Sequence, residues 1–366
     1  MKVRVLHVLN ELRPSGAEVM LVQASPVWRA EGIESEILAC GVTPGPFAQD
    51  MESAGFRVHH LPFQKTPASF CSLIRSLRRI RPDVVHIHSE AMSSYVALAA
   101  RLVGLRRVLR TVHSVFRFEG ALRIRKRFER QCQRILGVRE LAIGPSVHEN
   151  ELTRFGVDSL ICLNWCDTDY FRPPAPEERA EARARFGLTP DVVAISTVGN
   201  CAEVKNHSAL LHALASISPG PPWVYLHAGN EAPGMDERRL ASALGLADDV
   251  RFLGPVKDVR SLLWASDVFV MPSLYEGLGI AALEAAGTGV PMILTNVPGL
   301  RDFMAFDKSD SILWANDPTY VAIGEALERI FETRLTNLPR PWLKDKFSID
   351  CGVARYAGLY LGRRSC

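Results

Sequence analysis

Short apolar runs alternate along the chain with longer helical stretches. Residues 3–9, 83–88, 107–113, 192–198, 223–229 and 268–271 are apolar runs of the kind that forms buried parallel strands. Residues 70–81 and 93–104, which lie between such runs, have helical character. Regular alternation of strand and helix predicts an α/β protein with a doubly wound parallel sheet.

One stretch, residues 264–287, combines these signals most densely. The strand Val268–Met271 is followed by a glycine turn at 276–279 and then by a run rich in Ala, Leu and Glu, which are strong helix formers. Gly287 is the expected C-terminal cap of that helix. Because another apolar strand follows at 290–294, the stretch predicts a βαβ unit whose helix begins at the carboxyl edge of the sheet, where open α/β sheets bind ligands.

Two carboxylates belong to this unit, Glu276 before the helix and Glu284 on it. On one continuous helix they would lie roughly 12 Å apart along the axis. The N–H groups of Leu278, Gly279 and Ile280, together with the helix dipole, can hold an anion such as a diphosphate. Each carboxylate could then accept hydrogen bonds from hydroxyls, of a sugar on one side and a ribose on the other. The alternative is that Glu276 only interacts favourably with the helix dipole and that Glu284 is a solvated residue of the helix.

The segment from Glu276 to Glu284 resembles the E-x7-E signature of retaining, nucleotide-sugar-dependent glycosyltransferases of family 4, which have the GT-B fold. The resemblance implies two Rossmann-like, doubly wound parallel-sheet domains that face each other across a cleft. Residues 1–168 would form the N-terminal acceptor domain and residues 169–349 the nucleotide-sugar donor domain. A C-terminal helix, 350–366, would pack back on the first domain. A length of 366 residues agrees with two domains.

The resemblance also implies roles for residues of the second domain. Glu276 would position the donor sugar and Glu284 would hold the ribose. The loop 199–206 resembles the family's G-R-x4-K-N loop, so Lys205 would neutralise the diphosphate. The family's arginine is replaced there by Asn200.

Further donor contacts are implied at glycine-containing turns. Gly254 to Val256 would contact the nucleobase through the backbone. Gly16, in a turn similar to the family's glycine loop after the first strand, would lie near the donor phosphates or sugar. The expected donor-binding set is Gly16, Asn200, Gly254, Val256, Gly277, Leu278, Gly279, Ile280 and Glu284.

Histidines mark the ends of two strands in the first domain. His86 and His88 point to the same face of one strand, and His113 ends the next strand. A lone histidine is more often structural, but the family carries one at the place of His113, facing the transferred sugar. The expected catalytic residues are therefore His113, Lys205 and Glu276, with His88 as a candidate for the acceptor pocket.

Residues 101–139 are strongly basic, with twelve Arg or Lys against Glu119 and Glu129. Apolar residues such as Ile124 and Phe128 are interleaved. Three interpretations remain open: a solvated helix face, an anionic lipid surface at the inner side of the cell membrane, or direct binding of an anionic acceptor.

Composition limits the remaining possibilities. A net charge of +3 argues against a dedicated nucleic-acid binder. No stretch reaches 18 apolar residues without a charged one, so the sequence predicts no transmembrane helix. Eight scattered cysteines without a C-x-x-C pair indicate reduced thiols in a cytoplasmic protein. No cofactor and no metal are expected, since Asp167-Thr-Asp169 follows the family's linker pattern rather than a metal motif.

These observations predict a metal-independent glycosyltransferase that moves a sugar from a UDP-sugar to a saccharide, lipid-linked or natural-product acceptor, with retention of the anomeric configuration. The alternatives are a UDP-sugar epimerase on the same scaffold, or a non-catalytic module that binds a sugar nucleotide or a membrane.

Overall fold

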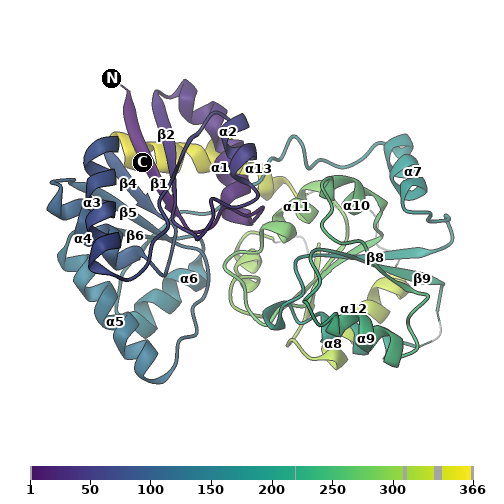
Figure 1. Cartoon of the computed structure of the whole chain (residues 1–366). Coiled ribbons are helices and arrows are strands. Elements are labelled where there is room, and N and C mark those ends of the chain that lie inside the picture. The colour runs from purple at the N-terminus through teal and green to yellow at the C-terminus, as the bar shows by residue number, and fades with distance from the viewer. Residues whose placement is uncertain (1, 219, 308–310, 334–339, 364–366) are drawn as a thin grey trace. The chain divides into compact units, whose positions relative to one another are not determined.

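A computed structural model describes residues 2–218, 220–307, 311–333 and 340–363 of the chain (Figure 1). The chain divides into two compact units. Unit 1 comprises Met1–Trp165 and Ile349–Cys366, and unit 2 comprises Cys166–Ser348. The sequence placed this boundary a few residues later, after residue 168. The final residues of the expected helix 350–366, 364–366, lie outside the described residues.

Unit 1 consists of a parallel sheet and its connecting helices. Its elements are β1 (Val3–Leu9), α1 (Gly16–Ala30), β2 (Ile33–Ala39), α2 (Ala48–Ser53), β3 (Arg57–His60), α3 (Pro67–Ile80), β4 (Val84–Ile87), α4 (Ser93–Leu102), β5 (Arg107–Val112), α5 (Gly120–Ile135), β6 (Arg139–Ala142), α6 (Pro145–Asn150), the π-helix η1 (Glu151–Phe155), β7 (Leu160–Ile161) and α14 (Ile349–Leu361). The seven strands have the order β3-β2-β1-β4-β5-β6-β7. The C-terminal helix α14 packs against α1 and β1.

Unit 2 repeats the architecture. Its elements are α7 (Pro176–Arg185), β8 (Val193–Val198), the 3-10 helix η2 (Glu203–Lys205), α8 (His207–Ser216), β9 (Trp223–Ala228), α9 (Asp236–Ala243), β10 (Val250–Phe252), α10 (Val259–Ala265), β11 (Val268–Met271), α11 (Ile280–Thr288), β12 (Met292–Thr295), the 3-10 helix η3 (Arg301–Ala305), β13 (Ile312–Ala315), α12 (Tyr320–Thr333) and α13 (Pro341–Phe347). Its six strands have the order β10-β9-β8-β11-β12-β13. All pairings in both sheets are parallel, which confirms the predicted fold class.

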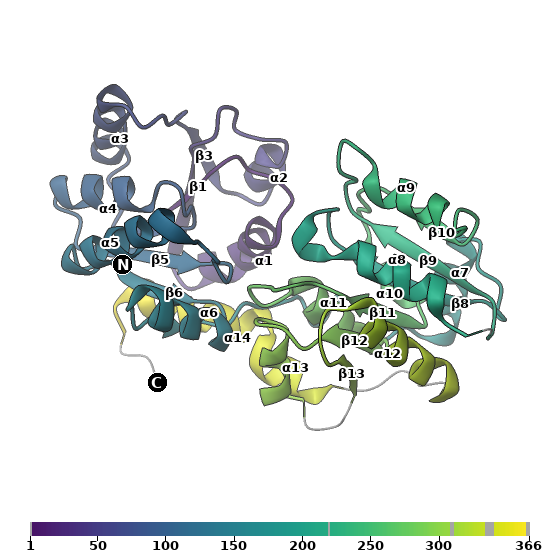
Figure 2. The same ribbon diagram turned by 90° about the horizontal axis from the view of Figure 1, so that it is seen from below.

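The apolar runs become strands because both faces of each sheet are covered. In β8, Ala194 packs into the core beneath α7 and α10, while its neighbour Ile195 packs into the core beneath α8 and α12. Successive strand residues point to opposite faces, so a strand buried on both sides must be apolar throughout. Figure 2 shows the helices that accompany the unit 2 strands from a second direction.

In both sheets the strand order reverses beside the first strand of the unit. In unit 1, β1 lies between β2 and β4, and in unit 2, β8 lies between β9 and β11. Ligands of open α/β sheets bind at such a switch point, outside the carboxyl ends of the strands. Both candidate sites described below lie at these two edges.

One predicted helix end is wrong. α11 continues through Gly287 to Thr288, and its C-terminal cap is Gly289, which has a φ of 75°. A left-handed cap residue ends a helix, and glycine adopts that conformation without a steric penalty.

Candidate active site

The rim of unit 2 is built from loops that follow successive strands and hydrogen bond to one another. Gly229 donates to the carbonyl of Gly254 (2.9 Å), and Cys201 donates to that of Asn230 (2.8 Å). On the other side, Leu274 donates to Val204 (2.8 Å). The loops after β8, β9, β10 and β11 therefore form one connected edge, which includes the donor-binding candidates Asn200 and Gly254.

At this edge Lys205 and Glu276 form an ion pair. The Lys205 Nζ lies 2.7 Å from the Glu276 Oε1, and the Ser273 hydroxyl donates to the same oxygen at 2.7 Å. The two side chains come from the loops after the adjacent strands β8 and β11. The structure thus brings together two of the three residues expected to be catalytic. The partner Ser273 was missed, although it precedes Glu276 by only three positions.

The backbone around Glu276 is held in place from β12. Its N–H donates to the carbonyl of Pro298 at 2.9 Å. At Gly299, which has a φ of 90°, an added Cβ would lie 2.3 Å from the Glu276 carbonyl oxygen. Only glycine permits this approach, so the loop after β12 fixes the height of Glu276 above the sheet.

Glu276 is not part of the helix that carries Glu284. α11 begins at Ile280, with Gly279 as its N-cap residue, and no side chain caps its N-terminus among the described residues. The estimate of roughly 12 Å between the two carboxylates, which assumed one continuous helix, therefore does not apply. The buried residues Gly277 and Leu278 form the turn that leads into the helix.

Glu284 lies within α11, in an environment unlike that of Glu276. It is largely buried, and burial raises the pKa of its carboxyl group to about 8. A group that donates hydrogen bonds to the charged form would lower this pKa again. Glu284 can thus respond to a hydroxyl-bearing ligand by releasing a proton.

The remaining donor candidates occupy the same rim or unit 1. Asn200 accepts hydrogen bonds from the backbone N–H of Asn230 (2.9 Å) and from its side-chain amide (3.1 Å), so it joins two loops. Gly254 and Val256 lie in the loop after β10, and Val256 packs partly into the core. Gly16 is the first residue of α1 in unit 1.

A second group of candidates lies at the edge of unit 1. The His88 Nδ1 and the His113 Nε2 are hydrogen bonded at 2.9 Å, and their rings stack with centroids 5.2 Å apart. Burial, followed by the charge of Arg110, lowers the pKa of His113 to about 4, and burial lowers that of His88 well below its usual value. Both rings are therefore neutral near pH 7. The sequence named both residues but not their contact.

Two protein-family models match the chain. The family model described as Glycosyltransferase Family 4 matches residues 14–162, and the one described as Glycosyl transferases group 1 matches residues 190–333. Together they account for most of both units. The chain belongs to the family 4 glycosyltransferases, as the E-x7-E resemblance indicated.

Individual proteins agree with this assignment. The chain is 29% identical to "Putative glycosyltransferase EpsF" of Bacillus subtilis, over 80% of this chain and 79% of the relative. It is 26% identical to "UDP-Gal:alpha-D-GlcNAc-diphosphoundecaprenol alpha-1,3-galactosyltransferase" of Escherichia coli, over 81% and 80%. The fold is also that of Anabaena Alr3699/HepE, crystallised in complex with UDP and glucose, with a TM-score of 0.82, 15% identity and coverage of 98% of this chain and 100% of that one.

Proposed function

We propose that this glycosyltransferase transfers a sugar from a UDP-sugar to a saccharide or lipid-linked acceptor, with retention at the anomeric carbon. The observation that carries the proposal is the Lys205–Glu276 pair, which lies at the switch point of unit 2 and just before the uncapped N-terminus of α11. A cation and free amide groups at one edge suit a diphosphate. A neighbouring carboxylate suits sugar hydroxyls.

In this reaction the bond between the anomeric carbon and the diphosphate breaks, and a bond to the acceptor oxygen forms. Lys205 and the amide groups at the start of α11 stabilise the negative charge that develops on the leaving diphosphate. The acceptor hydroxyl gives its proton to that diphosphate on the same face of the sugar. Glu276 orients the donor sugar and Glu284 the ribose. His113 contacts the transferred sugar.

Relatives support the choice of donor and acceptor. The Escherichia coli relative is named for UDP-Gal and for a lipid diphosphate acceptor, and the Anabaena structure holds UDP and glucose. The charges that the proposal needs are supplied by the chain itself, which is why we propose a metal-independent reaction.

The acceptor side has a feature of its own in α5. Its buried residues are polar, namely Lys126, Arg130 and Gln133. Its exposed residues include Ile124, Phe128 and Ile135, which are 73%, 69% and 84% exposed. These three lie within about 40° of one another around the helix axis. The helix thus turns an apolar stripe to the solvent.

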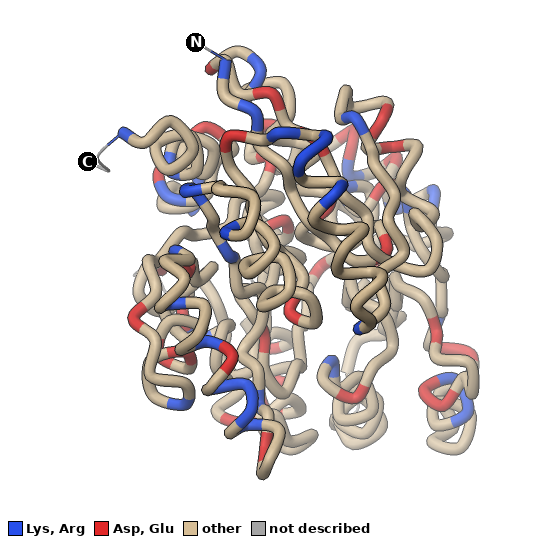
Figure 3. Tube along the Cα trace, turned by 60° about the vertical axis from the view of Figure 1, so that its left-hand side comes forward, with Lys and Arg blue, Asp and Glu red and all other residues tan. Residues whose placement is uncertain are grey.

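Exposed arginines flank this stripe, among them Arg125, Arg127 and Arg134, and Figure 3 shows Lys and Arg along this part of the chain. Apolar side chains among cations match the boundary of an anionic bilayer, where each cation contributes about 1 kcal/mol. Two residues of the basic segment, Lys126 and Arg130, do not take part. They point inward, where the Lys126 Nζ lies 3.1 Å and the Arg130 Nη1 3.2 Å from the Glu90 Oε1. We infer that α5 contacts the anionic membrane surface that carries a lipid-linked acceptor. No described helix has the length and hydrophobicity of a membrane span.

The donor is tested by thermal stabilisation with a set of nucleotide sugars, because a ligand that binds the folded state raises Tm. We expect a UDP-sugar to raise Tm and NAD to leave it unchanged. Product analysis then separates the alternatives. UDP released only with an acceptor indicates transfer, interconversion of free UDP-sugars indicates an epimerase, and neither indicates a binding module.

The membrane contact is tested by sedimentation with phosphatidylcholine vesicles that contain or lack phosphatidylglycerol. The variant with Ile124→Ser, Phe128→Ser and Ile135→Ser should lose at least about 10-fold in partitioning to the anionic vesicles. Leu102→Ser, which alters an exposed apolar residue of α4, is the matched control. Equal partitioning of the triple variant and the wild type would remove α5 from the interface.

A further inference from the structure

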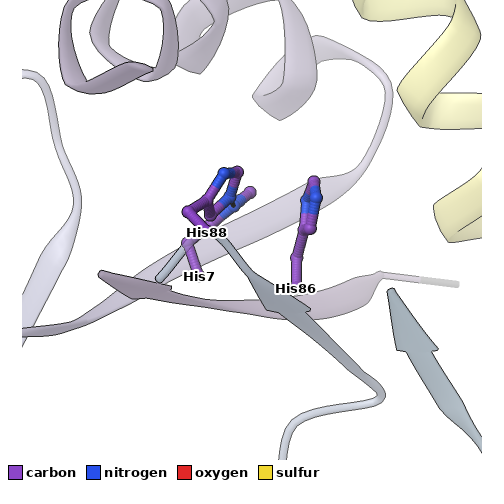
Figure 4. Close-up of side chains that lie close together, drawn as sticks. All are labelled: His7, His86 and His88. Carbon is purple, nitrogen blue, oxygen red and sulfur yellow. Dashed lines mark hydrogen bonds between the residues drawn. The ribbon is translucent and has the colours of Figure 1, made fainter. Parts of the chain in front are cut away.

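Histidines from three neighbouring strands gather at the edge of unit 1. His7 lies on β1, His86 and His88 on and just after β4, and His113 just after β5. Figure 4 shows that the first three rings rise from the same side of the sheet. The centroids of the His86 and His88 rings are 4.1 Å apart, and those of His7 and His88 are 5.3 Å apart.

By residue type and distance, His7, His86 and His88 could hold a metal ion, because one ring nitrogen of each lies within 4.8 Å of the others. The contacts of His86 argue against it. Its Nδ1 is 2.6 Å from the Tyr360 hydroxyl and its Nε2 is 2.7 Å from the Thr111 hydroxyl, so both nitrogens are engaged. A metal ligand needs a lone pair in the ring plane that is not already bonded.

The other three histidines form a continuous chain of hydrogen bonds. The His113 Nε2 is 2.9 Å from the His88 Nδ1, and the His88 Nε2 is 3.1 Å from the His7 Nδ1. The chain ends at Ser35, whose hydroxyl is 3.4 Å from the His7 Nε2. His86 borders the chain through its ring contact with His88.

The rings are neutral, since burial keeps the pKa of His7 at about 3 and that of His113 at about 4. A neutral imidazole has one N–H donor and one acceptor nitrogen. If His7 donates to His88, then His88 must donate to His113, and His113 carries its proton on Nδ1. If His113 donates to His88 instead, every bond reverses and the His113 Nδ1 is an acceptor. The tautomers of the three rings therefore change together.

We propose that His7 and His88 are positioning residues that hold the orientation of the His113 ring and couple its tautomer to their own, so that the three rings carry their protons all on Nδ1 or all on Nε2. The consequence for catalysis rests on the proposed function, in which His113 contacts the transferred sugar. Because the three rings change together, a sugar oxygen that bonds the His113 Nδ1 is supported by every bond of the chain. A His113 ring released from the chain loses that support and its fixed orientation, which weakens binding of the transition state more than folding.

The amide side chains distinguish the two ends of His88. In His88→Asn, an amide group replaces the ring at the position of Nδ1 and keeps the contact with His113. In His88→Gln, the amide reaches the position of Nε2 and keeps the contact with His7 instead. His88→Leu removes both. His60→Leu changes an exposed histidine of β3 and is the control.

The first measurement is the 15N spectrum of the histidine rings in the full chain without any ligand. The wild type should show His7, His88 and His113 as neutral rings at pH 7 with the same proportion of the Nδ1–H and Nε2–H tautomers. We expect His88→Leu to change the tautomer proportion of His113 so that it no longer matches that of His7, and His60→Leu to leave the His113 signals unchanged. Unchanged His113 signals in a folded His88→Leu protein would overturn the proposal.

The second measurement is turnover with the donor found by stabilisation. We expect His88→Leu and His88→Gln to lower kcat by about 10- to 100-fold with little change of KM, and His88→Asn to recover part of that loss. Equal losses in all three variants would show a merely structural role and would also overturn the proposal. If the wild type turns over no nucleotide sugar, the proposed function fails. The ring spectra still decide whether the hydrogen-bond chain controls the tautomer of His113.

Discussion

The two sheet edges have the same topology, but the candidate residues are charged at one edge and neutral at the other. At the edge of unit 2, Lys205 and Glu276 form a partly exposed ion pair, with 25% and 13% of the side chains accessible. At the edge of unit 1, His7, His88 and His113 form a chain of neutral rings that runs from the buried His7 to the partly exposed His113. In both cases the side chains come from strands that adjoin where the strand order reverses. The fold therefore supplies the position of a site, and the side chains supply its charge.

The histidine rings of unit 1 stay neutral although cations lie close to them. Arg110, on the same strand that leads to His113, is fully buried and is paired with Glu90 and with Glu140. Arg130 pairs with Glu151 at 2.5 Å. These glutamates neutralise the two buried arginines beneath the sheet edge. The histidine chain of unit 1 therefore offers a ligand uncharged ring nitrogens, whereas the loops of unit 2 offer the charged groups of Lys205 and Glu276.

The largest effect is expected for Glu276→Ala, which removes the carboxylate of the ionic edge. We expect kcat/KM to fall by at least about 1000-fold, because the donor sugar and Lys205 both lose their partner. Steady-state transfer assays measure the loss. Circular dichroism should show an intact fold, and Glu325→Ala, at an exposed position of α12, should behave like the wild type. Turnover of the alanine variant near the wild-type rate would remove Glu276 from the mechanism.

The buried charges of unit 1 are tested by Arg130→Leu. This change leaves Glu151 without its guanidinium partner in a buried site, which costs about 3–5 kcal/mol in the free energy of unfolding. Urea denaturation measures the difference, and Arg127→Leu, at an exposed position of the same helix, should change it by less than about 0.5 kcal/mol. Similar values for both variants would mean that the pairs beneath the edge do not hold unit 1 together.

Acid should destabilise the neutral edge. The folded-state pKa of His7 is about 3 and that of His113 about 4, both below the unfolded value of about 6.5. Protons therefore bind the unfolded chain first, so stability is complete above about pH 6.5 and declines as the pH falls toward 4, by up to about 1.4 kcal/mol per pH unit for each ring. Melting curves across this range measure the slope. His7→Phe should make the slope shallower by about one proton, and an unchanged slope would contradict a neutral His7.

A smaller effect is expected from Glu284. Its pKa of about 8 means that the free protein holds a proton that a ribose hydroxyl would displace. Affinity for UDP-glucose should therefore rise by up to about 10-fold per pH unit between pH 6 and 8 and level off above. Calorimetry in buffers of different ionisation enthalpy measures the proton released. Glu284→Gln should abolish this dependence, whereas a wild type without it would show that Glu284 does not meet the ligand as a carboxylate.

Much of the fold could be predicted from the sequence because strands buried on both faces must be apolar throughout. The pairing of strands could not, and that pairing decides the histidine chain. His7 sits in the apolar run 3–9 and was passed over, yet parallel pairing places it beside His86 on β4. The sequence does indicate that His7 has a hydrogen-bond partner, because a polar residue inside a buried strand requires one.

The same limit applies to the charged residues. The three interpretations of the basic segment treat its cations alike, but Lys126, Arg130 and Gln133 recur at helical spacing and form the buried face of α5. Their partners Glu90 and Glu151 lie far away in the sequence. Conversely, Lys205 and Glu276 could be predicted, because each belongs to a short local motif that resembles the family. Their loops follow adjacent strands at the switch point, where residues lie within reach of one ligand.

In the proposed reaction, Lys205 at the edge of unit 2 binds the diphosphate of the donor. Calorimetric titration of UDP into the wild type, Lys205→Met and the control Lys344→Met tests it most directly, since Lys344 is an exposed lysine of α13 with 75% of its side chain accessible. We predict that Lys205→Met weakens UDP binding by about 10- to 100-fold while Lys344→Met leaves it unchanged. A folded Lys205→Met protein that binds UDP as tightly as the wild type would show that Lys205 does not hold the diphosphate.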